Sequence, residues 1–452
     1  MNIVILNGSP AGKDSITLCT MLYIEKHFPE HSYEILNVGQ QIKKMEKDPD
    51  SWMPVLRSAD LIVFCYPIYT FLAPSQLHRF IELMKECGID FSGRYATQVT
   101  TSKHFYDITA HRYISDNCAD MKMKYIRGLS ADMEDLLREQ GQKEALDFFR
   151  YVLWNMEKGF SEPDPAPAGA FTPVPVGPAP EKAGITAPGK IIIVADYSHS
   201  EDHLLEDMCG YLKNILPCEA EIINIEDFPF AGGCLGCFRC ASDGKCVYKD
   251  GFDSYLREHI QTADGLVYAY TIKDHSMGYR FKIFDDRQFC NGHRTVTMGR
   301  PVAYLVDGPL DSEENLRVLM ESRAQVGGNT LAGIATNQRD PAGEIRQLAE
   351  TLRYDISEHY QPPKNFYGVG GLKIFRDLIW QMQGLMREDH RFYKKHGFYD
   401  FPQKRRGTMM AMYLVGGMMR SKKLSRKLGN RMSEGMMMPY SKVLGEKAGR
   451  KK

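Results

Sequence analysis

The stretch that decides the fold is Asn2-Ile-Val-Ile-Leu6, which is followed directly by Asn7-Gly8-Ser9-Pro10. An uninterrupted apolar run of this length predicts a strand that is buried on both faces, as in a parallel sheet covered by helices. The glycine and the proline predict a sharp turn after the strand. Residues 15–27 then predict a helix that returns across the sheet.

The same order of strand, loop and helix recurs along the chain. Residues 60–65 and 94–101 predict two more buried strands, and residues 74–87 predict an amphipathic helix between them. A second series begins at residue 190, with strands predicted over residues 190–195, 220–225, 264–269, 301–306 and 330–334. This alternation predicts an α/β protein with two doubly wound parallel sheets in tandem.

A proline-rich stretch separates the two series. Eight prolines lie between Pro163 and Pro188, with alanine and glycine among them, so this stretch can neither continue a helix nor sit inside a sheet. We therefore expect a first domain over residues 1–160, an extended linker over 161–188 and a second domain over 189–360. Residues 361–452 form a C-terminal extension with 21 Lys/Arg and 6 Asp/Glu.

The composition is that of a soluble protein. The chain has 452 residues, typical of two or three domains, and its 57 basic and 57 acidic side chains balance. Its longest apolar run, residues 409–419, is far shorter than the ~20 residues needed to cross a bilayer. Met1 precedes a predicted strand rather than a charged leader, and an odd number of cysteines argues against a secreted disulfide framework. We therefore expect a cytoplasmic protein.

The loop after the first strand has the chemistry of a phosphate site. Ser9, Ser15 and Thr17 offer hydroxyl donors, and the helix that begins near Ser15 offers free N–H groups and the positive end of its dipole. The loop has neither Walker spacing nor the Gly-x-Gly-x-x-Gly pattern of a dinucleotide fold. The alternative is a turn followed by an ordinary helix cap.

Together with Tyr66-Pro-Ile-Tyr-Thr-Phe71 and Pro74-Ser-Gln-Leu77, this loop resembles the NADPH-dependent FMN reductases, which have a flavodoxin-like fold. The resemblance implies FMN as cofactor and NAD(P)H as a possible electron donor. It places the phosphate at Ser9, Ser15 and Thr17. It places the flavin ring beside four residues of the second loop, namely Pro67, Ile68, Tyr69 and Thr70.

Two histidines follow the strand predicted over residues 94–101. His104 lies in the third loop, where the family often closes over the ring, and His111 follows it. Either imidazole could donate a proton to the substrate or stabilise charge on the flavin. The alternative for both is a surface or structural histidine.

Four cysteines in the second domain form the most specific motif of the chain, with the spacing C-x2-C-x2-C-x5-C: Cys234, Cys237, Cys240 and Cys246. Such a compact run is typical of a [4Fe–4S] cluster, whereas zinc sites more often use two separated pairs. The run also resembles the cluster motif of iron–sulfur flavoproteins, which belong to the same superfamily. Zinc and metal-free or redox-active thiols remain the alternatives.

The second domain departs from the family at the phosphate loop. Residues 196–202 include Asp196, Glu201 and Asp202, whose charges would repel a phosphate, so we expect FMN binding by this domain to be weak or absent. Residues 273–287 still resemble the family's loop and helix after the third strand, and either face the first domain's flavin or keep only a structural role. The resemblance to iron–sulfur flavoproteins implies an oligomer in which the cluster of one subunit lies near the FMN of another. The chain could therefore form an intramolecular pseudo-dimer or a homo-oligomer.

The C-terminal extension is basic and holds 11 of the 24 methionines. It forms either an accessory helical subdomain or a surface that docks ferredoxin, flavodoxin or an anionic membrane. No nucleic-acid recognition module is visible. The sequence predicts an oxidoreductase that moves electrons between NAD(P)H or reduced ferredoxin and a small acceptor through FMN and the cluster. A redox sensor or electron-transfer module and a zinc-stabilised scaffold are the alternatives.

Overall fold

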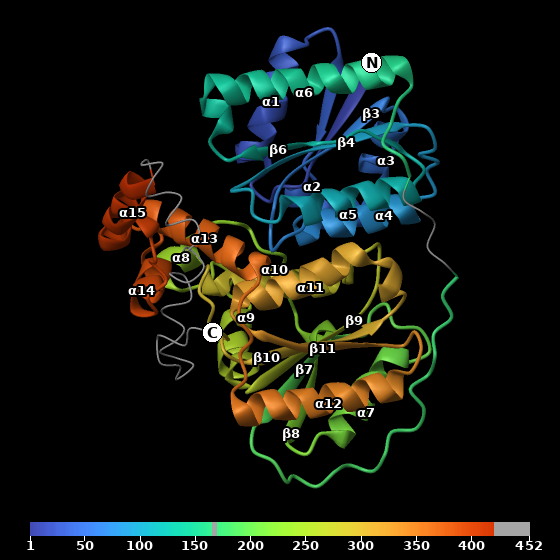
Figure 1. The fold of residues 1–452 in the computed structure, drawn as a ribbon. Coiled ribbons are helices and arrows are strands. Elements are labelled where there is room, and N and C mark those ends of the chain that lie inside the picture. Colours follow the sequence, from blue (N-terminus) through green and yellow to red (C-terminus); the bar gives the residue numbers. More distant parts are fainter. Residues whose placement is uncertain (165–169, 420–452) are drawn as a thin grey trace, which may run out of the picture. The chain divides into compact units, whose positions relative to one another are not determined.

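The computed structural model describes residues 1–164 and 170–419 (Figure 1). The chain divides into two compact units, residues 1–392 and residues 393–452. Both parallel sheets belong to the first unit. We keep the names first domain and second domain for the parts that contain these sheets.

The sheet of the first domain is entirely parallel, with the strand order β2-β1-β3-β4-β5, and β6 pairs with β4 beside β5. Its strands are β1 (Asn2–Asn7), β2 (Ser32–Leu36), β3 (Leu61–Pro67), β4 (Tyr95–Ser102), β5 (Lys124–Tyr125) and β6 (Leu129–Asp132). Ile3 and Ile5 point to one face of β1 and Val4 and Leu6 to the other, and all four are buried. Burial on both faces explains why this strand is apolar throughout.

Helices cover both faces of the first sheet: α1 (Ile16–His27), α2 (Val38–Lys47), α3 (Met53–Arg57), α4 (Ser75–Glu86), α5 (Asp107–Asp120) and α6 (Glu139–Lys158). α1 and α6 pack on the face of Ile3 and Ile5. α2, α4 and α5 pack on the opposite face (Figure 1). The C-terminal ends of the strands and the loops after them are therefore left open at one edge.

The second domain repeats this plan with the order β8-β7-β9-β10-β11, again entirely parallel. Its strands are β7 (Lys190–Asp196), β8 (Glu219–Asn224), β9 (Gly265–Thr271), β10 (Pro301–Asp307) and β11 (Thr330–Thr336). Numbered within each domain, both sheets have the order 2-1-3-4-5 of flavodoxin-like folds. The predicted fold class, two doubly wound parallel α/β sheets, is confirmed.

The helices of the second domain are α7 (Leu204–Ile215), α8 (Arg239–Asp243), α9 (Phe252–Glu258), α10 (Gly278–Arg287), α11 (Glu314–Gly327) and α12 (Pro341–Glu358). α7 and α12 cover one face of its sheet. α10 and α11 cover the other face and meet the first domain, where α10 packs on α4 and α11 on α5 (Figure 1).

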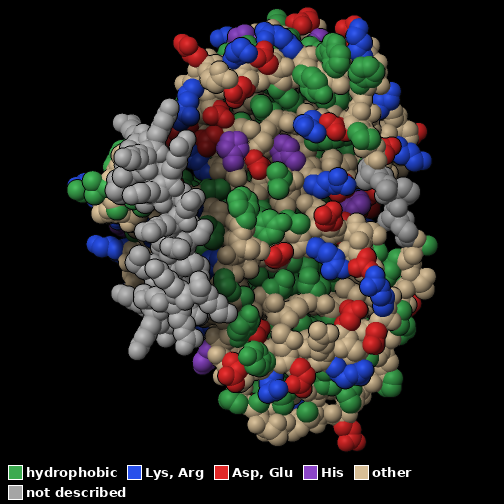
Figure 2. Space-filling model, in the orientation of Figure 1, with side chains coloured by type: hydrophobic (Ala, Val, Ile, Leu, Met, Phe, Trp, Pro, Cys, Tyr) green, Lys and Arg blue, Asp and Glu red, His purple; other side chains and the backbone are tan. Residues whose placement is uncertain are grey.

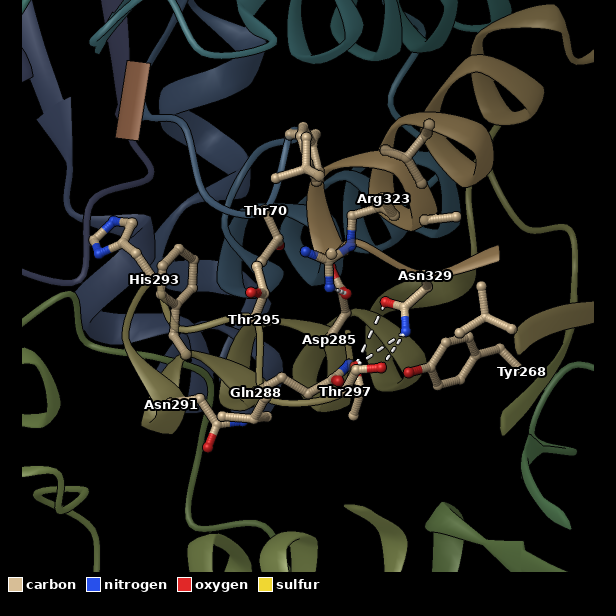
Figure 3. A pocket seen from close by; sticks show the side chains of 18 of the residues that line it. Thr70, Tyr268, Asp285, Gln288, Asn291, His293, Thr295, Thr297, Arg323 and Asn329 are labelled. Carbon is tan, nitrogen blue, oxygen red and sulfur yellow. Dashed lines mark hydrogen bonds and ion pairs between the residues drawn. The ribbon is translucent and has the colours of Figure 1, made fainter. Parts of the chain in front are cut away.

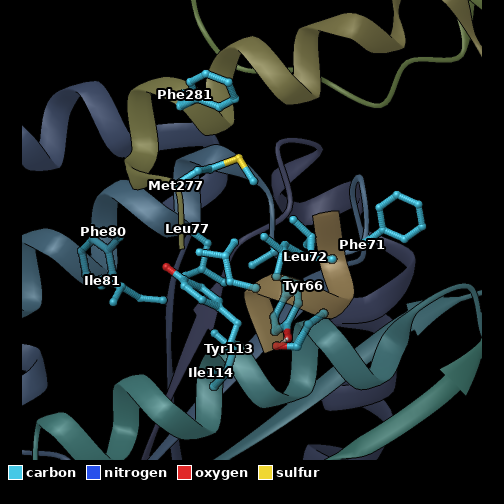
Figure 4. Close-up of a cluster of buried hydrophobic side chains, with 14 of the residues drawn as sticks. Tyr66, Phe71, Leu72, Leu77, Phe80, Ile81, Tyr113, Ile114, Met277 and Phe281 are labelled. Carbon is cyan, nitrogen blue, oxygen red and sulfur yellow. Dashed lines mark hydrogen bonds between the residues drawn. The ribbon is translucent and has the colours of Figure 1, made fainter. Parts of the chain in front are cut away.

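The two domains share one hydrophobic core. Met277 and Phe281 of the second domain belong to the same buried cluster as Leu77, Phe80 and Tyr113 of the first (Figure 4). Two similar folds that meet through equivalent helices form a pseudo-symmetric pair within one chain.

The linker forms no helix or strand in residues 161–164 and 170–188, the part of it that the structure describes. It runs along the second domain, where Val174 N donates to Asn337 O at 2.8 Å and Val176 is buried.

The C-terminal extension contains α13 (Phe366–Gln381), α14 (Arg387–Lys395) and α15 (Arg406–Met419). Gly368 and Gly371 lie in the first turns of α13 and let this helix approach α11 closely. A Cβ on Gly371 would lie 2.6 Å from Val326 Cγ2. The last predicted segment, the basic C-terminus, lies outside the described residues. Within the described residues, no helix has both the length and the apolar character to cross a bilayer.

Candidate functional site

A cavity of about 340 Å³ lies where the loops after β1, β3 and β4 meet the second domain. All seven residues predicted for the flavin line it: Ser9, Ser15, Thr17, Pro67, Ile68, Tyr69 and Thr70. They come from two loops about 50 residues apart in sequence, which the parallel sheet brings to one edge.

The loop after β1 is pre-shaped by its own hydrogen bonds. Asn7 Nδ2 donates to Gly12 O at 2.8 Å, and Ser15 Oγ caps α1 by accepting from Leu18 N at 3.3 Å. The hydroxyl oxygens of Thr17 and Thr101 lie 2.6 Å apart. Ser15 still has its O–H to donate, and it lies at the N-terminal end of α1. Hydroxyl donors at a helix N-terminus fit a phosphate.

The loop after β3 is strained. Thr70 and Phe71 have φ angles of 45° and 71°, in the left-handed region that side chains with a Cβ rarely adopt. The second domain holds the loop in this shape, since Asp286 Oδ1 accepts from Thr70 Oγ1 at 2.7 Å. Lys282 Nζ donates to Tyr69 O at 3.1 Å and also contacts Thr70 Oγ1.

Lys282 and Asp286 form an ion pair on α10 in which both side chains are 0% exposed. Burial raises the pKa of Asp286, and the neighbouring ammonium of Lys282 opposes that rise. Buried charges are tolerated only when their partners remain. We call these two residues the flavin-loop clamp; they lie more than 200 residues from the loop they hold.

Each domain also caps a helix of the other. Asp286 Oδ2 on α10 accepts from Ser75 N at the start of α4 at 2.8 Å. Glu82 Oε1 on α4 accepts from Tyr279 N at the start of α10 at 3.0 Å. Neither helix has a capping side chain of its own, so the carboxylates satisfy free N–H groups and complement both dipoles. Burial raises the pKa of Glu82 to about 7, and the neighbouring Arg79 guanidinium partly opposes this rise.

The four cysteines line the same cavity: Cys234, Cys237, Cys240 and Cys246. Their loop lies against the flavin loop, because a Cβ on Gly236 would be only 1.9 Å from the Tyr69 hydroxyl oxygen. Gln76 Nε2 donates to Cys234 O at 3.4 Å. The structure therefore brings together the residues predicted for the flavin and those predicted for the cluster.

The four thiols do not converge on a point. Within residues 1–164 and 170–419, no group of three or more His, Cys, Asp or Glu side chains is arranged to hold a metal ion. Burial raises the pKa of Cys234 and raises that of Cys240 to about 11. Four cysteine thiolates are nevertheless ligands that soft metals prefer. In a [4Fe–4S] cluster the four thiolates bind four different irons, so they need not converge on one ion.

Neither predicted histidine lines the cavity. His104 is largely exposed, and its Nδ1 lies 3.1 Å from Asp107 Oδ2. His111 Nε2 lies 2.8 Å from Thr100 Oγ1, and burial lowers the pKa of His111 to about 4. The neighbours of His104 in the chain, Lys103 and Phe105, do line the cavity. A catalytic role for His104 stays a prediction that this geometry does not favour.

A different histidine was missed. His293 lines the cavity and its Nδ1 lies 2.9 Å from Asp389 Oδ2, while Asp389 is fully buried. The carboxylate also accepts from His293 N at 3.0 Å, so the imidazole is oriented. The two residues are 96 positions apart in the sequence, so no local sequence pattern predicts that they form a pair.

A second cavity of about 160 Å³ adjoins the first; most of its lining residues belong to the second domain, and Thr70, Phe71 and Phe105 of the first domain also line it (Figure 3). Thr70 and His293 line both cavities. Its interior combines the Tyr268 ring with the ion pair between Arg323 and Asp285.

In the second domain, the loops after β7 and β9 make contacts that differ from those of the equivalent loops in the first domain. Asp196 Oδ1 accepts from Ser198 N and Oγ at 3.1 and 2.7 Å. His275 contacts Asp120 of the first domain at 3.0 Å. Residues 273–277 thus meet α5 of the first domain through His275, and α10 meets the loop after β3.

Residues 1–132 match the model of the NADPH-dependent FMN reductase family. No curated protein matches the sequence. Solved structures similar to this chain include an FMN-dependent NADH-azoreductase from Bacillus anthracis in complex with FMN, with 14% identity, 33% of this chain and 98% of that chain covered, and a TM-score of 0.27. General stress protein 14 from Treponema denticola, in complex with FMN, has 12% identity, 34% and 98% coverage and a TM-score of 0.27. An NAD(P)H:quinone oxidoreductase from Methanothermobacter marburgensis has 13% identity, 34% and 94% coverage and a TM-score of 0.27. The family match agrees with the prediction of an NAD(P)H-dependent flavin oxidoreductase.

Proposed function

We propose that the protein is an FMN-dependent oxidoreductase that takes electrons from NAD(P)H and passes them to a small acceptor. One observation carries this proposal: all seven residues predicted for FMN line one cavity at the carboxyl edge of the first sheet. The match of residues 1–132 to the NADPH-dependent FMN reductase family supports it independently.

The loop after β1 would hold the flavin phosphate. The hydroxyls of Ser9, Ser15 and Thr17 are buried at the cavity wall, at the N-terminal end of α1. Bound FMN supplies a ring that accepts a hydride or two electrons and releases them again. The residues around that ring would bind it, orient it and exclude water.

The strained loop would border the ring. Tyr69 and Phe71 line the cavity beside it, and the flavin-loop clamp contacts the Tyr69 carbonyl and the Thr70 hydroxyl from the second domain. A loop whose geometry is fixed in advance loses less entropy when the cofactor binds. His293, oriented by Asp389, lies where an imidazole could exchange a proton with an acceptor.

We further propose that Cys234, Cys237, Cys240 and Cys246 hold a [4Fe–4S] cluster beside the flavin. Their spacing, the soft thiolate donor set and their position on the wall of the same cavity support this. Because the pKa of Cys234 and of Cys240 is raised, binding must release protons from thiols that are otherwise neutral. Such a cluster would exchange single electrons with a partner such as ferredoxin.

The test is oxygen-free purification followed by an absorbance spectrum and quantitation of FMN, iron and sulfide. We expect FMN together with four irons per cluster, and oxidation of NADPH or NADH when a quinone is added. A Cys237→Ser variant should lose the cluster absorbance and keep FMN. The control is Cys19→Ser, because Cys19 is an exposed thiol of the first domain and should leave both spectra unchanged.

The outcomes separate the two parts of the proposal. A preparation with FMN and turnover but no iron would leave the flavin enzyme and remove the cluster. One zinc per chain would assign the cysteines to a structural site. A colourless protein without NAD(P)H oxidation would contradict both parts.

A further inference from the structure

The second cavity has the size and the walls of a site for one aromatic ring. Its volume is about 160 Å³, close to that of an engineered cavity of ~150 Å³ that binds benzene. Flat rings form part of its wall, among them those of Phe71, Tyr268 and Phe281. The rings of Tyr268 and Phe281 meet edge to face, with their centroids 6.1 Å apart. Walls of this kind favour a flat ligand, which packs on them by its face or its edge.

One arginine offers unused hydrogen-bond donors to this cavity. Arg323 of α11 lines the cavity, and Figure 3 shows its guanidinium pointing inward. A guanidinium carries five N–H donors. Among the residues that the structure describes, Arg323 donates a hydrogen bond only to Asp285 Oδ1. Most of its N–H groups can therefore donate to oxygen atoms of a ligand.

The guanidinium has a defined orientation before a ligand binds. It pairs with Asp285 and lies over the Phe71 ring, with its central carbon 5.3 Å from the ring centroid. Phe71 belongs to the loop after β3, so this arginine of the second domain also contacts the loop predicted to border the flavin. A donor that is oriented in advance loses less entropy when its ligand binds.

The cavity meets the cation of this ion pair more than the anion. The Arg323 side chain is 28% exposed and that of Asp285 only 7%. Asp285 Oδ2 is buried and lies 3.6 Å from Lys282 Nζ. A ligand in the cavity therefore faces the guanidinium, whose planar fork of donors matches the two oxygens of a carboxylate. On the face of the first unit drawn in Figure 2, acidic and basic side chains are interspersed, so charge alone does not gather anions there.

We propose that the second cavity binds a small aromatic carboxylate, with its ring against Tyr268 and Phe281 and its carboxylate on the N–H groups of Arg323. The Tyr268 hydroxyl points into the same cavity and can donate to a carboxylate oxygen (Figure 3). Because Thr70 and Phe71 line both cavities, the ligand lies beside the predicted flavin site. The proposal uses no contact with FMN and does not depend on the proposed function.

The test is isothermal titration calorimetry of the full-length protein with benzoate. Benzoate should bind at least ~10-fold more tightly than benzamide, which keeps the ring and lacks the charge. It should also bind at least ~10-fold more tightly than acetate, which keeps the charge and lacks the ring. Arg323→Gln should weaken benzoate binding by ~10-fold or more, and Tyr268→Phe should weaken it less. Circular dichroism checks that both variants fold, and the comparison of the three ligands tests the wild type in any case.

The matched control is Arg317→Gln, which changes an arginine of the same helix outside the cavity lining. Arg317 is 42% exposed and pairs with Asp311, so this variant should bind benzoate like the wild type. FMN content is measured in every sample, so a protein without FMN contradicts the proposed function and leaves this test valid. Equal affinities for benzoate and benzamide, or for the wild type and Arg323→Gln, would overturn the proposal. Displacement of FMN by benzoate would assign the second cavity to the flavin and overturn it too.

Discussion

At the scale of single residues, the loop predicted to border the flavin is held by two charges that come from outside its own domain. Asp286 accepts from Thr70 Oγ1 and from Ser75 N, and Lys282 donates to the Tyr69 carbonyl. Thr70 and Phe71 have positive φ angles, and these contacts help to stabilise that strained backbone. The clamp therefore links the stability of the interface to the shape of the flavin loop.

Replacing one member of the clamp should lower both the stability of the protein and its affinity for FMN. We expect Asp286→Ala to lower the free energy of unfolding by about 3–5 kcal/mol, because it removes the nearest carboxylate from the buried Lys282 ammonium and leaves Asp285 at 3.6 Å. FMN affinity should fall as well, since the loop at Thr70 is released. Urea denaturation and fluorescence titration with FMN measure the two effects.

A double variant separates charge from geometry. Lys282→Met/Asp286→Leu removes both charges, so it should regain much of the lost stability while FMN affinity stays low. Arg353→Ala is the control, because the ion pair between Arg353 and Glu350 is exposed and should contribute less than about 1 kcal/mol. Normal FMN affinity in the double variant would exclude a role for the clamp in shaping the loop.

At the scale of elements, α4 and α10 are joined by the reciprocal caps of Asp286 and Glu82. Burial raises the folded pKa of Glu82 to about 7, against about 4.3 in an unfolded chain. Between these two values the folded state binds more protons than the unfolded state. The contribution of Glu82 is therefore most favourable at low pH and is lost as the pH rises through this window.

A Glu82→Gln variant should lack this pH dependence, because the amide oxygen still accepts from Tyr279 N and carries no charge. Relative to the variant, the wild type should lose on the order of 3 kcal/mol of unfolding free energy between about pH 4.5 and 7. Chemical denaturation of both proteins across that range measures the difference. Two parallel stability curves would show that Glu82 titrates normally in the folded protein.

At the scale of the whole molecule, the two domains have the same strand order but carry different side chains at the carboxyl edge of their sheets. The first domain presents hydroxyls and a helix N-terminus to its cavity. The second domain carries acidic residues at 196–202, and Asp196 there uses its carboxylate within its own loop. The two domains thus share a strand order but differ in the chemistry of this edge.

We expect the chain to bind one FMN rather than two. A Ser15→Asp variant puts a negative charge beside the phosphate position and should remove nearly all FMN binding, by roughly 100-fold in affinity. Titration of wild type and variant with FMN, followed by flavin fluorescence, measures the stoichiometry. Ser198→Asp is the matched control in the second domain and should leave the stoichiometry unchanged. If the Ser15→Asp variant bound half as much FMN per chain as the wild type, the second domain would also bind FMN.

Local patterns predicted much of the architecture. The buried strands were visible because burial on both faces makes each of them a continuous apolar run, as in β1 and β7. β2 (Ser32–Leu36) was missed because it lies at the edge of the sheet and is half exposed, so its sequence mixes polar and apolar residues. β5 and β6 were missed because each is only two to four residues long.

The sequence by itself determined the repeated strand and helix order and the spacing of the four cysteines, because each is a contiguous pattern of a few residues. The seven residues predicted for the flavin come from two such contiguous patterns. Only the tertiary structure decided that the two loops and the cysteines line one cavity. It alone revealed the flavin-loop clamp and the pairing of His293 with Asp389. These contacts join residues about 100 to 200 positions apart, and their energy comes from burial and charge pairing that arise only once distant parts of the chain have packed together.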